Sequence, residues 1–179
     1  MEFKEVLSFW FNDIDSSKWW VKDSHFDALI ADKFLTLHQQ ANAGELFHWR
    51  KSAQGRLAEV IVLDQFSRNI FRDTPNAFAS DSLALVLSQE AISLGKHNEL
   101  NDIQRSFLYM PYMHSESLKI HDVALVLYKE NGVQSNLEFE IKHRDIIERF
   151  GRYPHRNSIL GRTSSIEEVE FLKQPGSSF

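Results

Sequence analysis

Cysteine is absent from this sequence, and glycine and proline are scarce, with seven and four among 179 residues. Without cysteine the chain has no disulfide, no thiolate metal site and no cysteine nucleophile, which fits a reducing compartment such as the cytoplasm. So few turn residues argue against a β-sandwich or β-barrel, in which a turn recurs about every 8–12 residues. The sequence therefore predicts a cytoplasmic protein that is not built from many short strands.

Long apolar runs are also missing. No stretch approaches the roughly 20 apolar residues that a membrane-spanning helix needs. The first residues include Glu2, Lys4 and Glu5 rather than a basic segment followed by an apolar one, so we expect no signal peptide. The net charge of −5 disfavours bulk attraction to nucleic acid. We therefore expect neither a membrane nor a nucleic acid as partner.

Apolar side chains, in contrast, are plentiful. Hydrophobic residues make up 42% of the chain and include 14 phenylalanines and 4 tryptophans. A chain of this length buries roughly 70% of its unfolded surface, so these side chains are enough for a packed core. No low-complexity linker divides the sequence. We expect a single domain over residues 1–179 with a frayed tail at 174–179, and no cofactor. The composition does not specify an oligomeric state.

The apolar residues recur with the 3.6-residue period of an α-helix along most of the chain. Ser24, Ser115 and Asn136 are expected to cap the second, sixth and seventh helices, whereas Pro75 closes the third and Pro111 ends or kinks the fifth. The expected helices cover residues 3–11, 24–44, 52–71, 80–95, 101–110, 115–132, 136–151 and 165–173. Their short connections predict an all-α fold of antiparallel helical pairs, an array of about eight helices.

Several charged or polar residues fall on helical faces that are expected to point inward. Asp64 and Arg68 lie one turn apart on such a face, Glu116 lies on another, and His143 lies on a third together with Phe139. Buried charges are costly unless they are paired. These positions predict either a structural ion-pair network or a shared internal cleft with a function.

A basic segment follows the seventh expected helix. Between residues 142 and 162 there are six positive and two negative residues, a local balance of +4 in a chain whose net charge is −5. Arginine forks match the geometry of carboxylates and phosphates, so a small anion or an acidic side chain is the natural ligand class. Alternatively, these arginines hold an irregular loop in place by bonding helix carbonyls and core carboxylates.

A metal site is not expected. Glu140 and His143 form an E-x-x-H pair of the kind found in di-iron helical bundles, but such a site needs a second pair, and the sequence has none.

Four runs of sequence carry a more specific signal: L-D-Q-F-S-R-N-I-F-R at 63–72, A-F-A-S-D at 77–81, F-L-Y-M-P-Y-M-H-S-E at 107–116 and R-F-G-R-Y-P-H-R-N-S-I-L-G-R at 149–162. The N-terminal V-L-S-F-W-F at 6–11 and the closing E-E-V-E-F-L at 167–172 add to it. With these runs the chain resembles, over nearly its whole length, the bacterial family known as domain of unknown function 924.

The resemblance implies an all-α, tetratricopeptide-like fold and no particular activity. It also marks polar motif positions, which are Asp64, Gln65, Arg68, Asn69, His114, Glu116, His143, Arg152, His155, Arg156, Asn157 and Arg162. The sequence departs from the family pattern at Ser67, where proline is usual, and at Ser117, where an acidic residue is common. The first departure bears on helix geometry, and the second weakens any pair of carboxylates around Glu116.

Three functions remain open. In the first, the helices form a polar cleft that binds a small anion, an acidic peptide or a peptide carboxylate. In the second, the same cleft belongs to a hydrolase-like or other acid/base enzyme that uses His and Asp or Glu. In the third, the protein is an interaction scaffold and the polar network is purely structural. For the ligand-binding hypothesis the expected site residues are Asp64, Arg68, Asn69, His114, Glu116, His143, Arg152, His155, Arg156, Asn157 and Arg162.

Overall fold

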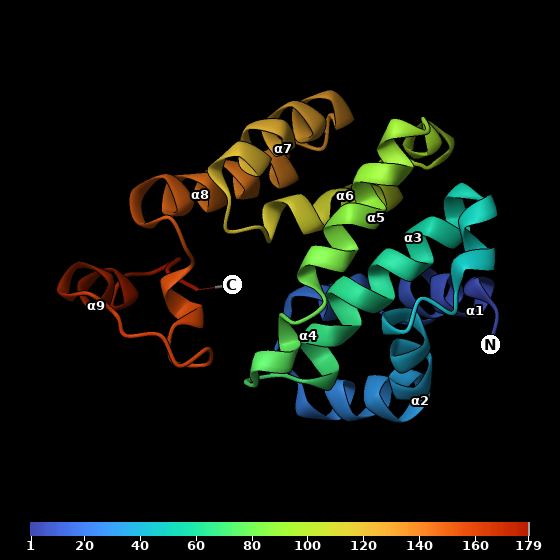
Figure 1. The fold of residues 1–179 in the computed structure, drawn as a ribbon, viewed down its shortest axis with the longest axis horizontal. Helices are drawn as coiled ribbons and strands as arrows, with labels where there is room; N and C mark the ends of the chain where they lie inside the picture. Colours follow the sequence, from blue (N-terminus) through green and yellow to red (C-terminus); the bar gives the residue numbers. More distant parts are fainter. Residues whose placement is uncertain (179) are drawn as a thin grey trace.

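The computed structural model describes residues 1–178, and these residues contain helices and no strand. The α-helices are α1 (Phe3–Ser8), α2 (Ser24–Asn42), α3 (Ala53–Ile61), α4 (Ser67–Ile70), α5 (Asp81–Ser93), α6 (Asp102–Met113), α7 (Leu118–Asn131), α8 (Gln134–Phe150) and α9 (Ile166–Leu172). Helices α3 and α4 are parts of one continuous helix, as Figure 1 shows. The nine α-helices of the described residues therefore form eight helical rods. The prediction of an all-α array of about eight helices is confirmed.

Shorter helical turns connect the rods. The π-helical turns are η1 (Phe9–Asp13) and η4 (Val62–Phe66), and the 3-10 turns are η2 (Ser16–Trp20), η3 (Phe47–Lys51), η5 (Pro75–Ala77), η6 (Lys96–Glu99) and η7 (Pro154–Arg156). The turn η4 joins α3 to α4 without a break and contains Asp64. A π turn inserts one residue into the helical register, and such turns are frequent at functional sites.

Ser67, the position where the family pattern has proline, follows this π turn directly. Its hydroxyl donates to the Leu63 carbonyl oxygen at 2.6 Å and lies 2.7 Å from His38 Nε2. Serine therefore ties the turn to α2 through a side-chain hydrogen bond that proline has no group to make.

The ends of several helices differ from the expected ones. Asp23, not Ser24, caps α2, because its carboxylate accepts from the backbone of the first turn. The chain enters α7 at Leu118, so Ser115 caps nothing there. Helix α8 begins at Gln134, two residues before Asn136, and is not capped by that side chain.

Pro111 does not end α6. The helix continues through it to Met113, with the proline ring buried. Packing on both sides of this helix outweighs the loss of one backbone donor. The glycine stops were predicted correctly for α7 and α8, since Gly132 and Gly151 adopt left-handed conformations with φ of 77° and 68° that L side chains rarely take.

Helices α5, α6, α7 and α8 run back and forth, and each packs against the next (Figure 1). Helix α3 packs against α5 and α6, α1 packs against α3, and α2 packs against α4. Their apolar faces form a large core that extends from α1 to α7. A separate small core is built from Ile146, Ile147 and Tyr153, with Leu118 and Phe171 against them. The segment after α8 therefore packs on its own apolar cluster, next to the large core.

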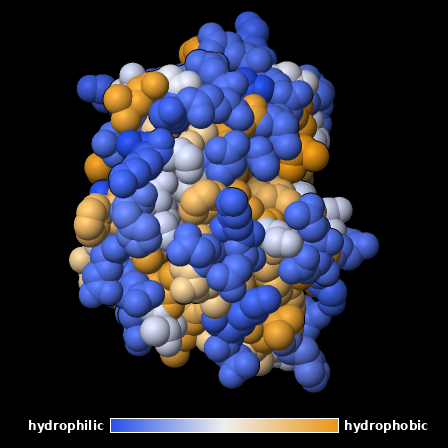
Figure 2. Space-filling view, turned by 90° about the vertical axis from the view of Figure 1, so that its right-hand side faces the viewer, coloured by the Kyte–Doolittle hydropathy of each residue, from blue (hydrophilic) through white to orange (hydrophobic). Residues whose placement is uncertain are grey.

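Figure 2 shows the side of the molecule where α1 lies. Polar residues cover most of this face, and apolar residues appear between them in separate patches. Within residues 1–178, no helix combines the length and the apolar character needed to cross a membrane.

Candidate functional site

A group of charged side chains lies where the two cores meet, and we call it the inner cluster. Its members come from five different elements: η4, α4, the start of α5, the end of α6, and η7. They are Asp64, Arg68, Asp81, His114 and Arg156. The local sequence places each of them, because Asp64 and Arg68 are one helical turn apart and His114 is the C-cap of α6.

Asp64 and His114 form a close pair inside this cluster. His114 Nδ1 lies 2.7 Å from Asp64 Oδ1, and Gln65 donates to the other carboxylate oxygen at 2.5 Å. Burial opposes ionisation of Asp64, but the charges of Arg68 and His114 and these hydrogen bonds hold the pKa of Asp64 below its usual value. Asp64 is therefore ionised and accepts the Nδ1 proton, which leaves Nε2 of a neutral His114 with a free lone pair.

The His114 ring is the more accessible member of the pair. The His114 side chain is 13% exposed, whereas that of Asp64 is 1% exposed. Burial, followed by the charge of Arg68, lowers the pKa of His114, and Asp64 opposes this shift. No hydrogen bond from Nε2 to another residue is found in the described part of the chain. His114 is thus a neutral imidazole at neutral pH, held by an ionised carboxylate.

Arg68 makes several close contacts with acidic residues. Its guanidinium donates two hydrogen bonds to Asp81, both at 3.0 Å, and one to the Asp64 backbone carbonyl at 2.7 Å. It also lies 3.3 Å from the Asp64 carboxylate. Arg68 therefore uses both carboxylates of the inner cluster.

Arg156 is much less well paired. Its Nη1 lies 3.5 Å from the Asp81 oxygen that Arg68 already binds, and its buried Nε has no hydrogen-bond partner. The central carbon of its guanidinium lies 4.6 Å from the ring centroids of both Phe78 and Tyr153. These two aromatic contacts leave the N–H groups of the guanidinium to bind a ligand. Burial and the nearby charge of Arg68 lower the pKa of Arg156.

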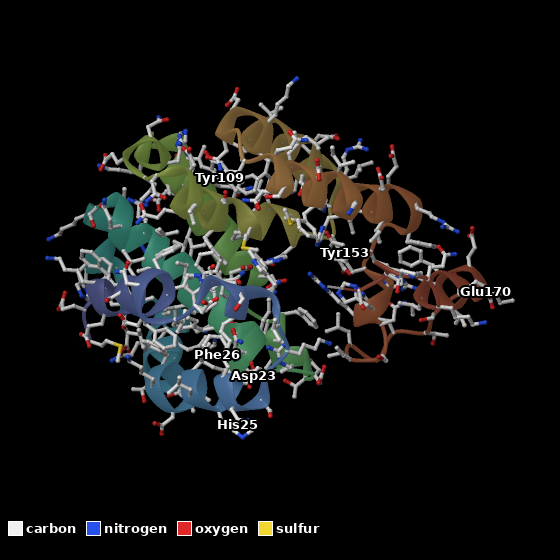
Figure 3. All side chains as sticks on the ribbon, turned by 180° about the vertical axis from the view of Figure 1, so that it is seen from behind. Asp23, His25, Phe26, Tyr109, Tyr153 and Glu170 are labelled. Carbon is white, nitrogen blue, oxygen red and sulfur yellow. The ribbon has the colours of Figure 1, made fainter. Side chains whose placement is uncertain are left out.

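Tyr153 connects the inner cluster to three histidines. Its ring lies 5.5 Å from that of His155, 5.7 Å from that of His143 and 6.3 Å from that of His121. Burial lowers the pKa of His155 to about 4 and that of His143 to about 3, so both are neutral at pH 7. Figure 3 shows Tyr153 between the C-terminal helices and the rest of the molecule, where the two cores meet.

Two further arginines of the basic segment form closed ion pairs, which we call the outer pairs. Arg162 donates two hydrogen bonds to Glu116, at 2.6 and 2.9 Å, and others to Asn157 and the Tyr153 carbonyl. Arg152 donates to both oxygens of Glu168, at 2.7 and 2.8 Å. Both arginines thus bind carboxylates and backbone oxygens of the protein itself, which is the arrangement expected of residues that hold the loop in place.

The other expected site residues are placed as follows. Asn157 bonds Arg162 and Ser164 and belongs with the outer pairs. Asn69 lies apart from both groups, because it donates to Asp27 on α2 at 2.8 Å. Glu116 precedes α7 instead of lying on it, and it accepts from the Tyr153 backbone N–H.

The sequence predicted that His143 and Phe139 both face inward on α8. This prediction is confirmed for His143 and wrong for Phe139. His143 is buried and its Nδ1 donates to the Phe139 carbonyl oxygen at 2.7 Å. The Phe139 side chain itself is 51% exposed. Helix α8 turns a narrow face toward α7 and the small core, and Glu140, not Phe139, lies fully buried on it.

Sequence reasoning missed Asp81, Phe78 and Tyr153 as parts of the site. The first two lie in the A-F-A-S-D run that carried the family resemblance, so a signal was present. It also missed the pair His121–Glu140, whose Nδ1 and Oε1 atoms are 2.7 Å apart and whose side chains are 0% exposed. Burial raises the pKa of Glu140, and the second His121 nitrogen bonds the Ser115 carbonyl oxygen.

The side chains of the inner cluster are largely buried. Two surface hollows of about 330 and 310 Å³ lie elsewhere. Asp23, His25 and Phe26, labelled in Figure 3, line the larger one at the start of α2. Within the cluster, the side chains of Arg68, Asp81 and His114 are 20%, 17% and 13% exposed. Through these three side chains the edge of the cluster is in contact with solvent.

These features describe an all-α protein with a partly paired Arg–His–Asp cluster between two cores. The chain belongs to the family described as bacterial protein of unknown function (DUF924), whose model matches residues 6–176. Its fold is similar to that of a protein of unknown function from Agrobacterium tumefaciens, with 37% sequence identity, a TM-score of 0.90 and 96% of each chain covered. None of the curated proteins compared with the chain matches it.

Proposed function

We propose that the inner cluster binds a small anion or the carboxylate end of a larger molecule, with Arg156 as the receptor. The observation that carries this proposal is the pairing of Arg156. It shares Asp81 with Arg68 at 3.5 Å, and its Nε has no hydrogen-bond partner. A buried guanidinium that is only partly neutralised gains from a negatively charged ligand.

The neighbours of Arg156 favour a small ligand group. The guanidinium carbon lies 4.6 Å from the ring centroids of Phe78 and Tyr153 and Nε is buried, so a carboxylate or phosphate is expected at the terminal Nη groups. The neutral rings of His143 and His155 nearby add no positive charge that would compete for the anion. The exposed fractions of 13–20% at the edge of the cluster suit a carboxylate or phosphate better than a long side chain.

Titration calorimetry tests the proposal. Inorganic phosphate, acetate, a peptide with a free C-terminus and the same peptide with an amidated C-terminus are titrated into the parent protein and into Arg156→Leu. We expect saturable binding of at least one anion to the parent and at least about a tenfold loss in the variant, the equivalent of ~1.4 kcal/mol. Binding of the free but not the amidated peptide would identify a terminal carboxylate as the ligand. No saturable binding of any probe to the parent protein would refute the proposal.

A further inference from the structure

We infer that this site also catalyses hydrolysis: His114 acts as a general base toward esters that carry an ionised carboxylate. The inference rests on the proposed anion site, because Arg156 anchors the carboxylate of the substrate while His114 acts on its acyl group. The geometry that points to it is the Asp64–His114 pair at 2.7 Å, which is connected to the incompletely paired Arg156 through Arg68 and Asp81.

The contrast with the second histidine–carboxylate pair supports this role. His121 uses both ring nitrogens within the protein, one with Glu140 and one with the Ser115 carbonyl oxygen, and its side chain is 0% exposed. His114 uses only Nδ1 and keeps 13% of its side chain exposed. A general base must bring an unprotonated nitrogen within reach of the proton it removes. His114 meets this condition, and His121 does not.

The arrangement favours attack by water over a covalent intermediate. The sequence has no cysteine, and no serine or threonine hydroxyl is bonded to His114 in the described residues. Activation of an amino-acid nucleophile requires that it hydrogen-bond to its base. The nucleophile that remains for His114 Nε2 is a water molecule.

The proposed reaction is balanced without a further reactant. Nε2 removes a proton from the water while the water oxygen forms a bond to the acyl carbon of the ester. The ester C–O bond then breaks, and the imidazolium returns the same proton to the departing alkoxide. The products are a carboxylic acid and an alcohol. Asp64 is a positioning residue, because it orients the ring and stabilises the imidazolium that forms during the reaction.

Hydrolysis assays on two 4-nitrophenyl esters test the inference. One ester has an acyl group that ends in a carboxylate, and the other has a neutral acyl group of similar length. We expect the parent protein to hydrolyse the anionic ester and His114→Gln to lose at least ~100-fold, within the range for general-base catalysis. Arg156→Leu should lose the preference for the anionic ester. His25→Gln is the matched control, since this side chain is 100% exposed and should not affect the rate.

The pH profile separates catalysis from mere positioning. In the parent protein kcat/KM rises with pH as His114 loses its proton. Asp64→Asn removes the charge that opposes the lowering of the His114 pKa, so the rise should move to lower pH and the maximal rate should fall. Rates in the parent that equal those in buffer, or that are unchanged by His114→Gln, would overturn the inference. Retained anion binding in the calorimetric experiment would then show that the anion site stands without the catalytic step.

Discussion

Arg156 and Arg162 lie six residues apart in one loop, and the structure uses them differently. The Arg162 guanidinium donates hydrogen bonds to Glu116, to Asn157 and to a backbone carbonyl oxygen. Arg156 is more deeply buried, with 7% of its side chain exposed against 24% for Arg162, and yet its ion pair is longer and its Nε has no partner. A structural arginine is expected to be better paired where it is more buried. Here the more buried arginine is the less well paired one. We therefore interpret Arg162 as a residue that holds the loop and Arg156 as the candidate receptor for an anion.

The largest expected effect is on stability at Arg162. Arg162→Leu removes both hydrogen bonds to Glu116 and leaves that carboxylate with only the Tyr153 N–H as a partner. We expect the free energy of unfolding to fall by about 2–3 kcal/mol, less than for a fully buried pair because both side chains are about one-quarter exposed. Urea unfolding measures the change. A fall below ~0.5 kcal/mol would mean that the outer pair does not hold the loop.

The matching change at Arg156 should have a smaller effect on stability. Arg156→Leu keeps an apolar contact with Phe78 and Tyr153, and Asp81 retains two hydrogen bonds from Arg68. Because the desolvation of a poorly paired charge is removed, the free energy of unfolding should change by less than about 1 kcal/mol. A loss as large as that of Arg162→Leu in the same urea series would place Arg156 among the structural arginines.

A pH effect is expected from His155. Its pKa is about 4 in the fold, below the ordinary value of 6.5, so the unfolded chain binds the additional proton between these two values. The contribution of His155 to stability therefore falls as the pH drops from 6.5 toward 4 and is constant below that range. His155→Gln should flatten this slope by up to about 1 kcal/mol per pH unit. Identical slopes in parent and variant would contradict the lowered pKa.

A second pH effect is expected at the other outer pair, Arg152–Glu168, and it lies at lower pH. The hydrogen bond from Arg152 lowers the pKa of Glu168 to about 2, from 4.5. Its contribution to stability is complete above pH 4.5 and is lost as the pH falls through about 2. In acid unfolding curves, Glu168→Gln should therefore differ most from the parent above pH 4.5 and converge with it near pH 2. Curves that stay parallel would refute this assignment.

Much of the fold could be predicted from the sequence, because helix period and glycine stops are local properties. The ends that were wrong are those where several capping residues compete, as Asp23 and Ser24 do before α2. The exposed Phe139 shows a different limit. An amphipathic pattern gives the direction of a helix face only approximately, and packing against neighbouring helices decides which of two adjacent residues is buried.

The candidate site could be predicted only in part. Burial of Asp64 and His143 followed from their positions on apolar faces. The division of the arginines did not, because Arg156 and Arg162 are the same residue type in the same motif, and their carboxylates lie 75 and 46 residues away. Which acid pairs with which arginine depends on long-range packing. Asp81 was missed for the same reason, since its role requires contact with both Arg68 and Arg156.

A crystal structure grown with phosphate or acetate, at the concentration that saturates the calorimetric signal, would show whether Arg156 is the receptor. We expect an anion at the edge of the inner cluster, with one oxygen about 3 Å from a terminal nitrogen of the Arg156 guanidinium and none at Arg162. An anion at some other place, or an Arg156 Nε paired with a protein carboxylate and no anion beside it, would contradict the claim that Arg156 is the receptor.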